Sequence, residues 1–128
     1  MPIPLQSNTQ ISFAEQGAMV DPVWNGFFGC VAPPCGDTIA LSVTDDFGNS
    51  VVYIFQRASN YVEHTATRYT EIFLDPSGGT STRNLFDDLS RIAGPLEVGS
   101  SIVSIQFGIS AEGWAALDDL KIGTSLSP

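Results

Sequence analysis

Hydrophobic and polar residues alternate in two stretches near the C-terminus, which predicts two long strands. The first stretch carries apolar residues at every second position: Val103, Ile105, Phe107 and Ile109. A period of two is typical of a strand with one buried face. Residues 110–113 then have turn chemistry, and 114–122 alternates again, so we expect a hairpin whose two strands pair with each other.

Asp118 is the exception in the second of these strands. The alternation places it on the same side as Leu120 and Ile122. A bare carboxylate on a buried face would cost on the order of several kcal/mol unless it is paired or bound to a metal ion. We therefore expect an inward-facing Asp118 that has a partner.

Similar patterns predict further strands and one helix. Strands are predicted at 10–15, 38–44 and 51–56, with one or two more within 61–75. From 81 to 92 the apolar residues recur at helical spacing, with Ser81 as the expected cap and Gly94-Pro95 as the stop. The apolar residues of that helical face are Leu85, Phe86, Leu89 and Ile92.

The order of these elements predicts the fold class. Strands separated by turns at intervals of roughly 8–12 residues are typical of an antiparallel β-sandwich. We therefore expect an all-β fold, an antiparallel jelly-roll β-sandwich with one short helix that covers an open end. Residues 1–9 are predicted to be a loose lead-in and 10–128 a single domain, since 128 residues suffice for one hydrophobic core.

Charge and composition narrow the possible partners. The chain has 14 acidic and 5 basic side chains, a net charge of −9, which disfavours nucleic acid and anionic membrane surfaces and is compatible with cations. No apolar run is long enough for membrane insertion, and residues 1–10 lack the basic start and apolar core of a signal peptide. We expect the chain to belong to a longer secreted or cell-surface protein.

Cys30 and Cys35, in the stretch CVAPPC, are close enough to form a small disulfide loop stiffened by two prolines. Two free thiols are the main alternative. A zinc site would need further ligands, and the only histidine is His64. A disulfide would indicate an oxidising, extracellular setting.

Catalytic motifs are absent from the sequence. Three pairs of adjacent acids occur: Asp45-Asp46, Asp87-Asp88 and Asp118-Asp119. Adjacent residues in a strand point to opposite faces, so none of these pairs forms a glycosidase dyad by itself. The chain is predicted not to be an enzyme, with a small glycoside-active enzyme as a minor alternative.

Calcium is the metal that the acidic residues favour, because it takes oxygen ligands from carboxylates and loop carbonyls. Glu15 closes the first predicted strand and Asp118 lies in the last. If these two strands lie side by side, both carboxylates reach one site. The alternative is that Asp118 accepts structural hydrogen bonds from the backbone or from an arginine.

Two short motifs resemble a known family. The closing segment Ala116-Leu117-Asp118-Asp119-Leu120-Lys121-Ile122 and the segment Phe13-Ala14-Glu15 look like the last and first strands of carbohydrate-binding modules with the galactose-binding-like jelly-roll fold. The resemblance implies Asp118 and Glu15 as ligands of a structural calcium ion, and Trp24 as the counterpart of an early tryptophan.

A sugar site needs aromatic side chains to stack on the ring and polar groups to bind its hydroxyls. The predicted ligand-binding residues are Trp24, Asn25, Phe28, Tyr61, Arg68 and Tyr69. The expected function is non-catalytic binding of a polysaccharide or glycan. The alternative is a structural or adhesive, protein-binding β-sandwich of a larger extracellular or virion protein.

Overall fold

The computed structural model describes residues 3–19, 38–57, 63–74, 79–96, 99–109 and 113–124. Its strands are β1 (Ile3–Pro4), β2 (Gln10–Met19), β3 (Thr38–Asp45), β4 (Ser50–Arg57), β5 (Tyr69–Phe73), β6 (Gly79–Asn84), β7 (Ser101–Ile109) and β8 (Gly113–Gly123). One helix, α1 (Leu85–Leu89), follows β6. The all-β prediction with one short helix is confirmed.

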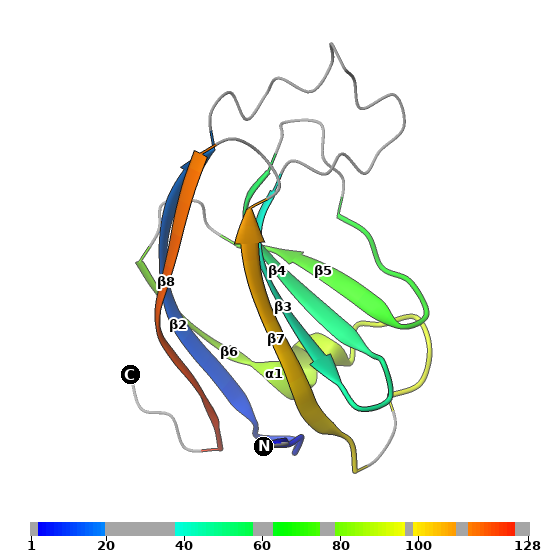
Figure 1. Cartoon of the computed structure of the whole chain (residues 1–128). Coiled ribbons are helices and arrows are strands. Elements are labelled where there is room, and N and C mark those ends of the chain that lie inside the picture. The colour runs from blue at the N-terminus through cyan, green and yellow to red at the C-terminus, as the bar shows by residue number, and fades with distance from the viewer. Residues whose placement is uncertain are drawn as a thin grey trace.

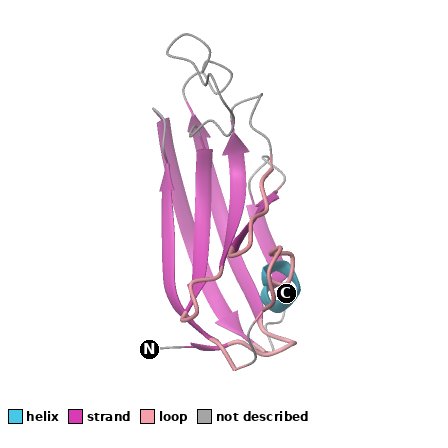
Figure 2. Cartoon of the chain, turned by 90° about the vertical axis from the view of Figure 1, so that its right-hand side faces the viewer, coloured by secondary structure: helices cyan, strands magenta, loops and turns pink. Residues whose placement is uncertain are grey.

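Two sheets pack face to face (Figure 1). The larger has the strand order β1-β7-β3-β4-β5, and the smaller has the order β6-β2-β8. Helix α1 contacts β4 and β5 of the larger sheet and β2 and β6 of the smaller one. Figure 2 shows it beside the strands, at one lateral edge of the sandwich, so it lies along an open side and not over an end as predicted.

The core lies between the sheets and is rich in aromatic residues. Phe13 of β2 packs against Tyr53 and Phe55 of β4, with ring centroids 5.7 and 5.5 Å apart. Phe55 also contacts Phe107 of β7, at 6.0 Å. Such tilted and edge-to-face pairs are the arrangements that aromatic rings prefer. Phe13 therefore joins the smaller sheet to the larger one.

The C-terminal hairpin was predicted with the wrong pairing. Strands β7 and β8 do not pair with each other, because β7 pairs with β1 and β3 while β8 pairs with β2. The two strands therefore lie in different sheets, as Figure 1 shows. Local alternation could not distinguish the two arrangements, since both bury one face of each strand.

Two further predictions need correction. Strand β5 pairs with β4 in parallel, so the sandwich is not antiparallel throughout. The predicted helix over 81–92 is shorter, because Ser81 belongs to β6 and α1 begins at Leu85. The N-cap is Asn84, whose side chain accepts a hydrogen bond from the backbone N–H of Asp87 at 2.9 Å.

Bulges interrupt the alternation in three strands. Near the start of β7, Ser104 pairs with Thr44 of β3, but Ile102 pairs with the next residue of β3, Asp45. Val103 is therefore an additional residue of β7 without a counterpart in β3. Ile102 is therefore the buried residue and Val103 is 53% exposed, contrary to the predicted inward position of Val103. Register shifts of the same kind occur in β4, opposite β3, and in β8, opposite β2.

Candidate binding hollow beside helix α1

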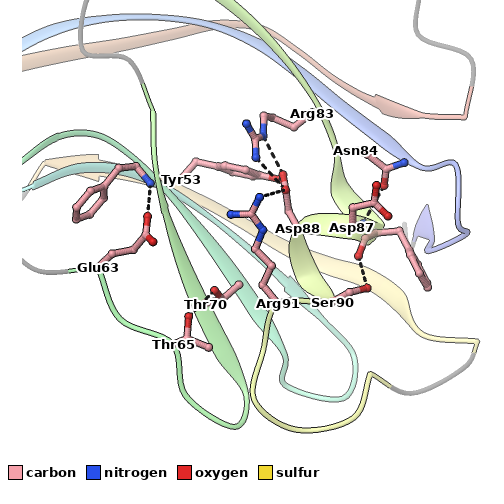
Figure 3. A network of polar contacts seen from close by, with 12 residues as sticks. Tyr53, Glu63, Thr65, Thr70, Arg83, Asn84, Asp87, Asp88, Ser90 and Arg91 are labelled. Carbon is pink, nitrogen blue, oxygen red and sulfur yellow. Dashed lines mark hydrogen bonds and ion pairs between the residues drawn. The ribbon is translucent and has the colours of Figure 1, made fainter.

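A shallow hollow of about 320 Å³ lies where β6 passes into α1. The residues that line it are all polar or charged: Thr82, Arg83, Asn84, Asp87, Asp88 and Arg91. Strand β6 contributes the first three, and α1 with the turn after it contributes the others. Figure 3 shows the polar contacts around it.

Asp88 forms the floor of the hollow and is only 3% exposed. Its Oδ2 accepts a hydrogen bond from the Tyr53 hydroxyl at 2.7 Å and another from Arg83 Nε at 3.0 Å. Its Oδ1 accepts from Arg83 Nη2 at 3.0 Å, so the arginine fork binds both carboxylate oxygens. Through Asp88, α1 is joined to β6 and to the buried Tyr53 of β4.

The protonation states in this network follow from the same contacts. Burial raises the pKa of the Tyr53 hydroxyl far above its usual value, and the charge and hydrogen bond of Asp88 raise it further. The hydrogen bond to Asp88 also raises the pKa of Arg83, outweighing the effect of burial. A neutral tyrosine and a charged arginine therefore both donate to an acceptor, which makes the floor rigid.

Two charged side chains at the rim are much less engaged. Arg91 is 54% exposed, and its Nη2 comes no closer than 4.0 Å to Asp88 Oδ1. Asp87 is exposed, and although its backbone N–H binds Asn84, its carboxylate has no partner among the described residues. The hollow thus presents an acceptor and a donor above a fixed floor.

The sequence singled out the Asp87-Asp88 pair and offered Tyr53 as a candidate stacking residue for a sugar, a role that its complete burial excludes. It missed Arg83, Asn84 and Arg91 as members of a site. The spacing of Asp88 and Arg91, three residues apart after a predicted helix start, was a readable signal. The contact between Arg83 and Asp88 depends on the strand-to-helix transition at Asn84. The contact from Tyr53 spans two elements far apart in the chain and has no local signal.

Most of the predicted sugar-binding residues lie outside the described residues. These are Trp24, Asn25, Phe28 and Tyr61, and the predicted disulfide partners Cys30 and Cys35 lie outside them as well. Their roles stay predictions.

Arg68 and Tyr69 are described, and neither lines the hollow. Arg68 donates from Nη1 to the carbonyl of Phe47 at 3.0 Å and to Asn49 Oδ1 at 3.3 Å. It therefore braces the turn between β3 and β4, while the half-buried Tyr69 begins β5. The structure does not bring these two residues together with the residues of the hollow.

Glu15 and Asp118 lie in neighbouring strands, as predicted. The register pairs Ala14 with Asp118 and Glu15 with Leu117, so the two carboxylates point to opposite faces of the smaller sheet. Glu15 is buried, whereas Asp118 is exposed and accepts a hydrogen bond from the backbone N–H of Asp119 at 2.8 Å. The predicted inward orientation of Asp118 is wrong.

The reason is the bulge in β8. Ser12 pairs with Lys121 and Ala14 with Asp118, which leaves two residues of β8 opposite Phe13. One of them, Asp119, has a φ of 54°, the left-handed conformation that Asp adopts more readily than most residues. The additional residue reverses the alternation, so Asp118 turns outward.

The arrangement fits only part of the calcium site implied by the resemblance. Glu15 is suited to be a ligand, because its Oε2 is buried and has no hydrogen-bond partner among the described residues. Asp118 does not fit as the second ligand of the same ion. Among the described residues, no three His, Cys, Asp or Glu side chains gather in a way that could hold a metal. Calcium stays a prediction that Glu15 alone supports.

Glu15→Gln is expected to raise the stability at pH 7 in the presence of a chelator. Burial raises the pKa of the Glu15 carboxyl, so the folded state holds its proton where the unfolded chain has lost it. At low pH the buried carboxyl is protonated and neutral. The free energy of unfolding falls as the pH rises through the raised pKa, because the buried group then becomes charged. The neutral glutamine should be more stable by about 1–3 kcal/mol at pH 7 and equal to the wild type below about pH 4.

Urea denaturation of both proteins across this pH range measures the difference. If Glu15 holds calcium, added calcium should stabilise the wild type and leave the glutamine variant unchanged. If Glu15→Gln is less stable than the wild type in chelator at pH 7, the conclusion that the buried Glu15 carboxylate destabilises the fold is wrong.

The described part of the chain has no helix of the length and apolar character needed to cross a membrane. In comparisons with protein-family models, with curated proteins and with solved structures, the chain has no match.

Proposed function

We propose that this domain binds carbohydrate without cleaving it, through the hollow beside α1. The observation that carries the proposal is a polar hollow with a rigid floor at Asp88 and, at its rim, the exposed Arg91 guanidinium as donor and the exposed Asp87 carboxylate as acceptor. An extracellular location, suggested by the spacing of Cys30 and Cys35, and attachment to a larger secreted protein belong to the same proposal.

Sugar hydroxyls both donate and accept hydrogen bonds, which matches the rim. The Asp87 carboxylate can accept from hydroxyls and the Arg91 guanidinium can donate to them. The volume of about 320 Å³ lies at the small end of the usual range for ligand pockets, roughly 300–1,000 Å³. Because Asp88 is already held by Tyr53 and Arg83, the floor loses little conformational freedom when a ligand binds.

The same contacts support a non-catalytic role. Glycoside hydrolysis commonly needs two carboxyl groups, one on each side of the scissile bond, roughly 5–10 Å apart. Both oxygens of Asp88 are engaged by Arg83 and Tyr53. Asp87 is therefore the one carboxylate of the hollow that is free to take part in proton transfer.

An aromatic residue that stacks on the sugar ring is absent from the lining of the hollow. Binding there would rest on hydrogen bonds unless an aromatic residue outside the described part contributes. Trp24, Phe28 and Tyr61 keep their predicted role as stacking residues within the proposal.

Asp87→Asn is expected to weaken glycan binding about tenfold or more, because a hydrogen bond to a charged group contributes about 1.5–3 kcal/mol. Isothermal titration with the best ligand from a glycan and polysaccharide panel measures the change. Asp119→Asn is the matched control, since it makes the same charge change on β8, and its left-handed conformation tolerates asparagine. Equal affinities of the wild type and Asp87→Asn would exclude the hollow as the site.

A protein-binding role is the second candidate, and one observation favours it. Phe47 and Val103 are large exposed apolar residues, 46% and 53% accessible. Two hydrogen bonds join the segments that carry them: the Asp46 backbone N–H donates to the Ser101 carbonyl, and the Ser101 backbone N–H donates to Asp46 Oδ1. Absence of binding by folded protein across the whole glycan panel would favour this alternative.

A further inference from the structure

We propose that the ligand of the hollow is an acidic sugar, a uronic acid whose carboxylate pairs with Arg91. The inference rests on the proposed carbohydrate-binding function and specifies its ligand class. It follows from how the charges of the hollow are distributed between its floor and its rim.

Two arginines and two aspartates line the hollow, so it holds a large share of the chain's few cations. The chain has only 5 basic side chains and a net charge of −9, yet Arg83 and Arg91 both line this one hollow. The charge of Arg83 is cancelled by Asp88, which it binds with both Nε and Nη2. Arg91 is the cation that is left for a ligand.

Among the described residues, Arg91 has only a long, exposed ion pair, with Asp88. It is four residues after Asp87, but α1 ends at Leu89 and the structure shows no ion pair between Arg91 and Asp87. Its nearest carboxylate oxygen, on Asp88, is 4.0 Å away and already accepts a 3.0 Å bond from Arg83. The half-exposed guanidinium fork can therefore receive a carboxylate in two parallel hydrogen bonds.

A uronic acid has the two kinds of group that this rim can bind. Its carboxylate matches the Arg91 fork, and its hydroxyls match the Asp87 carboxylate. Asn84 adds little, because its Nδ2 donates to the Ser7 carbonyl and its Oδ1 accepts from Asp87. A neutral sugar would leave Arg91 with only its 4.0 Å ion pair to Asp88, and a ligand with anionic groups alone would be repelled by Asp87.

The test compares each acidic ligand with its uncharged form. Oligosaccharides of galacturonic, glucuronic and mannuronic acid, and their methyl esters, are titrated into the protein together with a panel of neutral oligosaccharides. We expect at least one acid to bind tenfold or more tightly than its ester. The preference should weaken as salt is raised, because an exposed ion pair is screened.

Arg91→Gln should abolish the preference for the acid over the ester and leave the melting temperature unchanged, since the Arg91 side chain makes no polar contact closer than its 4.0 Å ion pair with Asp88 among the described residues. Lys121→Gln removes the same charge from an exposed position on β8 and should keep the preference.

The outcomes separate the two proposals. Equal binding of acid and ester, binding of neutral sugars alone, or a preference that survives Arg91→Gln would overturn the acidic-sugar inference while carbohydrate binding stands. No binding of any sugar, acidic or neutral, by folded protein would overturn the proposed function itself.

Discussion

Asp88→Ala is expected to lower the free energy of unfolding by about 3–5 kcal/mol, since it removes one partner of a buried ion pair. Two groups would lose their acceptor: the Tyr53 hydroxyl, which is completely buried, and the Arg83 guanidinium. The side chain of Arg83 is 30% exposed and can reach water, so the loss should fall toward the lower end of that range. Urea denaturation of the variant and the wild type measures it.

Two further variants separate the parts of this network. Tyr53→Phe removes one hydrogen bond and leaves Asp88 paired with Arg83, so it should cost only about 1 kcal/mol. Asp87→Asn, one residue away on the exposed side, should leave stability unchanged within about 0.5 kcal/mol. A loss below about 1 kcal/mol for Asp88→Ala would show that the network does not hold α1 against the two sheets.

Phe13→Ala is expected to cost about 3–5 kcal/mol, the usual effect of removing a large aromatic side chain from a packed core. Phe13 is completely buried and is the residue of the smaller sheet that contacts both Tyr53 and Phe55. Its removal would leave a cavity between the sheets that neither ring can fill without leaving its own contacts.

A loss of this size is comparable to the whole stability of many domains, about 5–15 kcal/mol, so a milder variant is needed beside it. Phe13→Leu keeps most of the buried surface and should fall between the alanine variant and the wild type. Val103→Ala is the control for an apolar truncation, and its exposed position predicts a change within about 0.5 kcal/mol. Similar losses for Phe13→Ala and Val103→Ala would contradict the assignment of the core.

The residues that the sequence placed in strands are mostly the residues that form them. Alternation predicted the positions of β3 and β4 within one or two residues, because each strand has a single continuous buried face over most of its length. The apolar residues expected on one helical face, among them Leu85, Leu89 and Ile92, are buried. The strand positions and the helical face were therefore predictable from local pattern.

Errors arose where the backbone departs from regular geometry. Val103 and Asp118 were both placed on the buried side because a period of two was assumed to continue through the strand. A bulge adds one residue and exchanges the two faces beyond it, and neither site has a glycine to announce the irregularity. The calcium prediction depended on the orientation of Asp118, so this local change separated its two proposed ligands.

The sequence by itself thus determined most of the strand segments, though not β1 and β6, and which of their residues are apolar enough to form the core, since these are properties of short stretches. Tertiary structure alone decided that β7 and β8 belong to different sheets and that β5 runs parallel to β4, because strand pairing is a choice among distant segments with similar patterns. Tertiary structure also decided that the residues of the hollow come together. Tyr53 and Asp88 are 35 residues apart, and only the packing of α1 between the sheets brings the hydroxyl and the carboxylate within 2.7 Å.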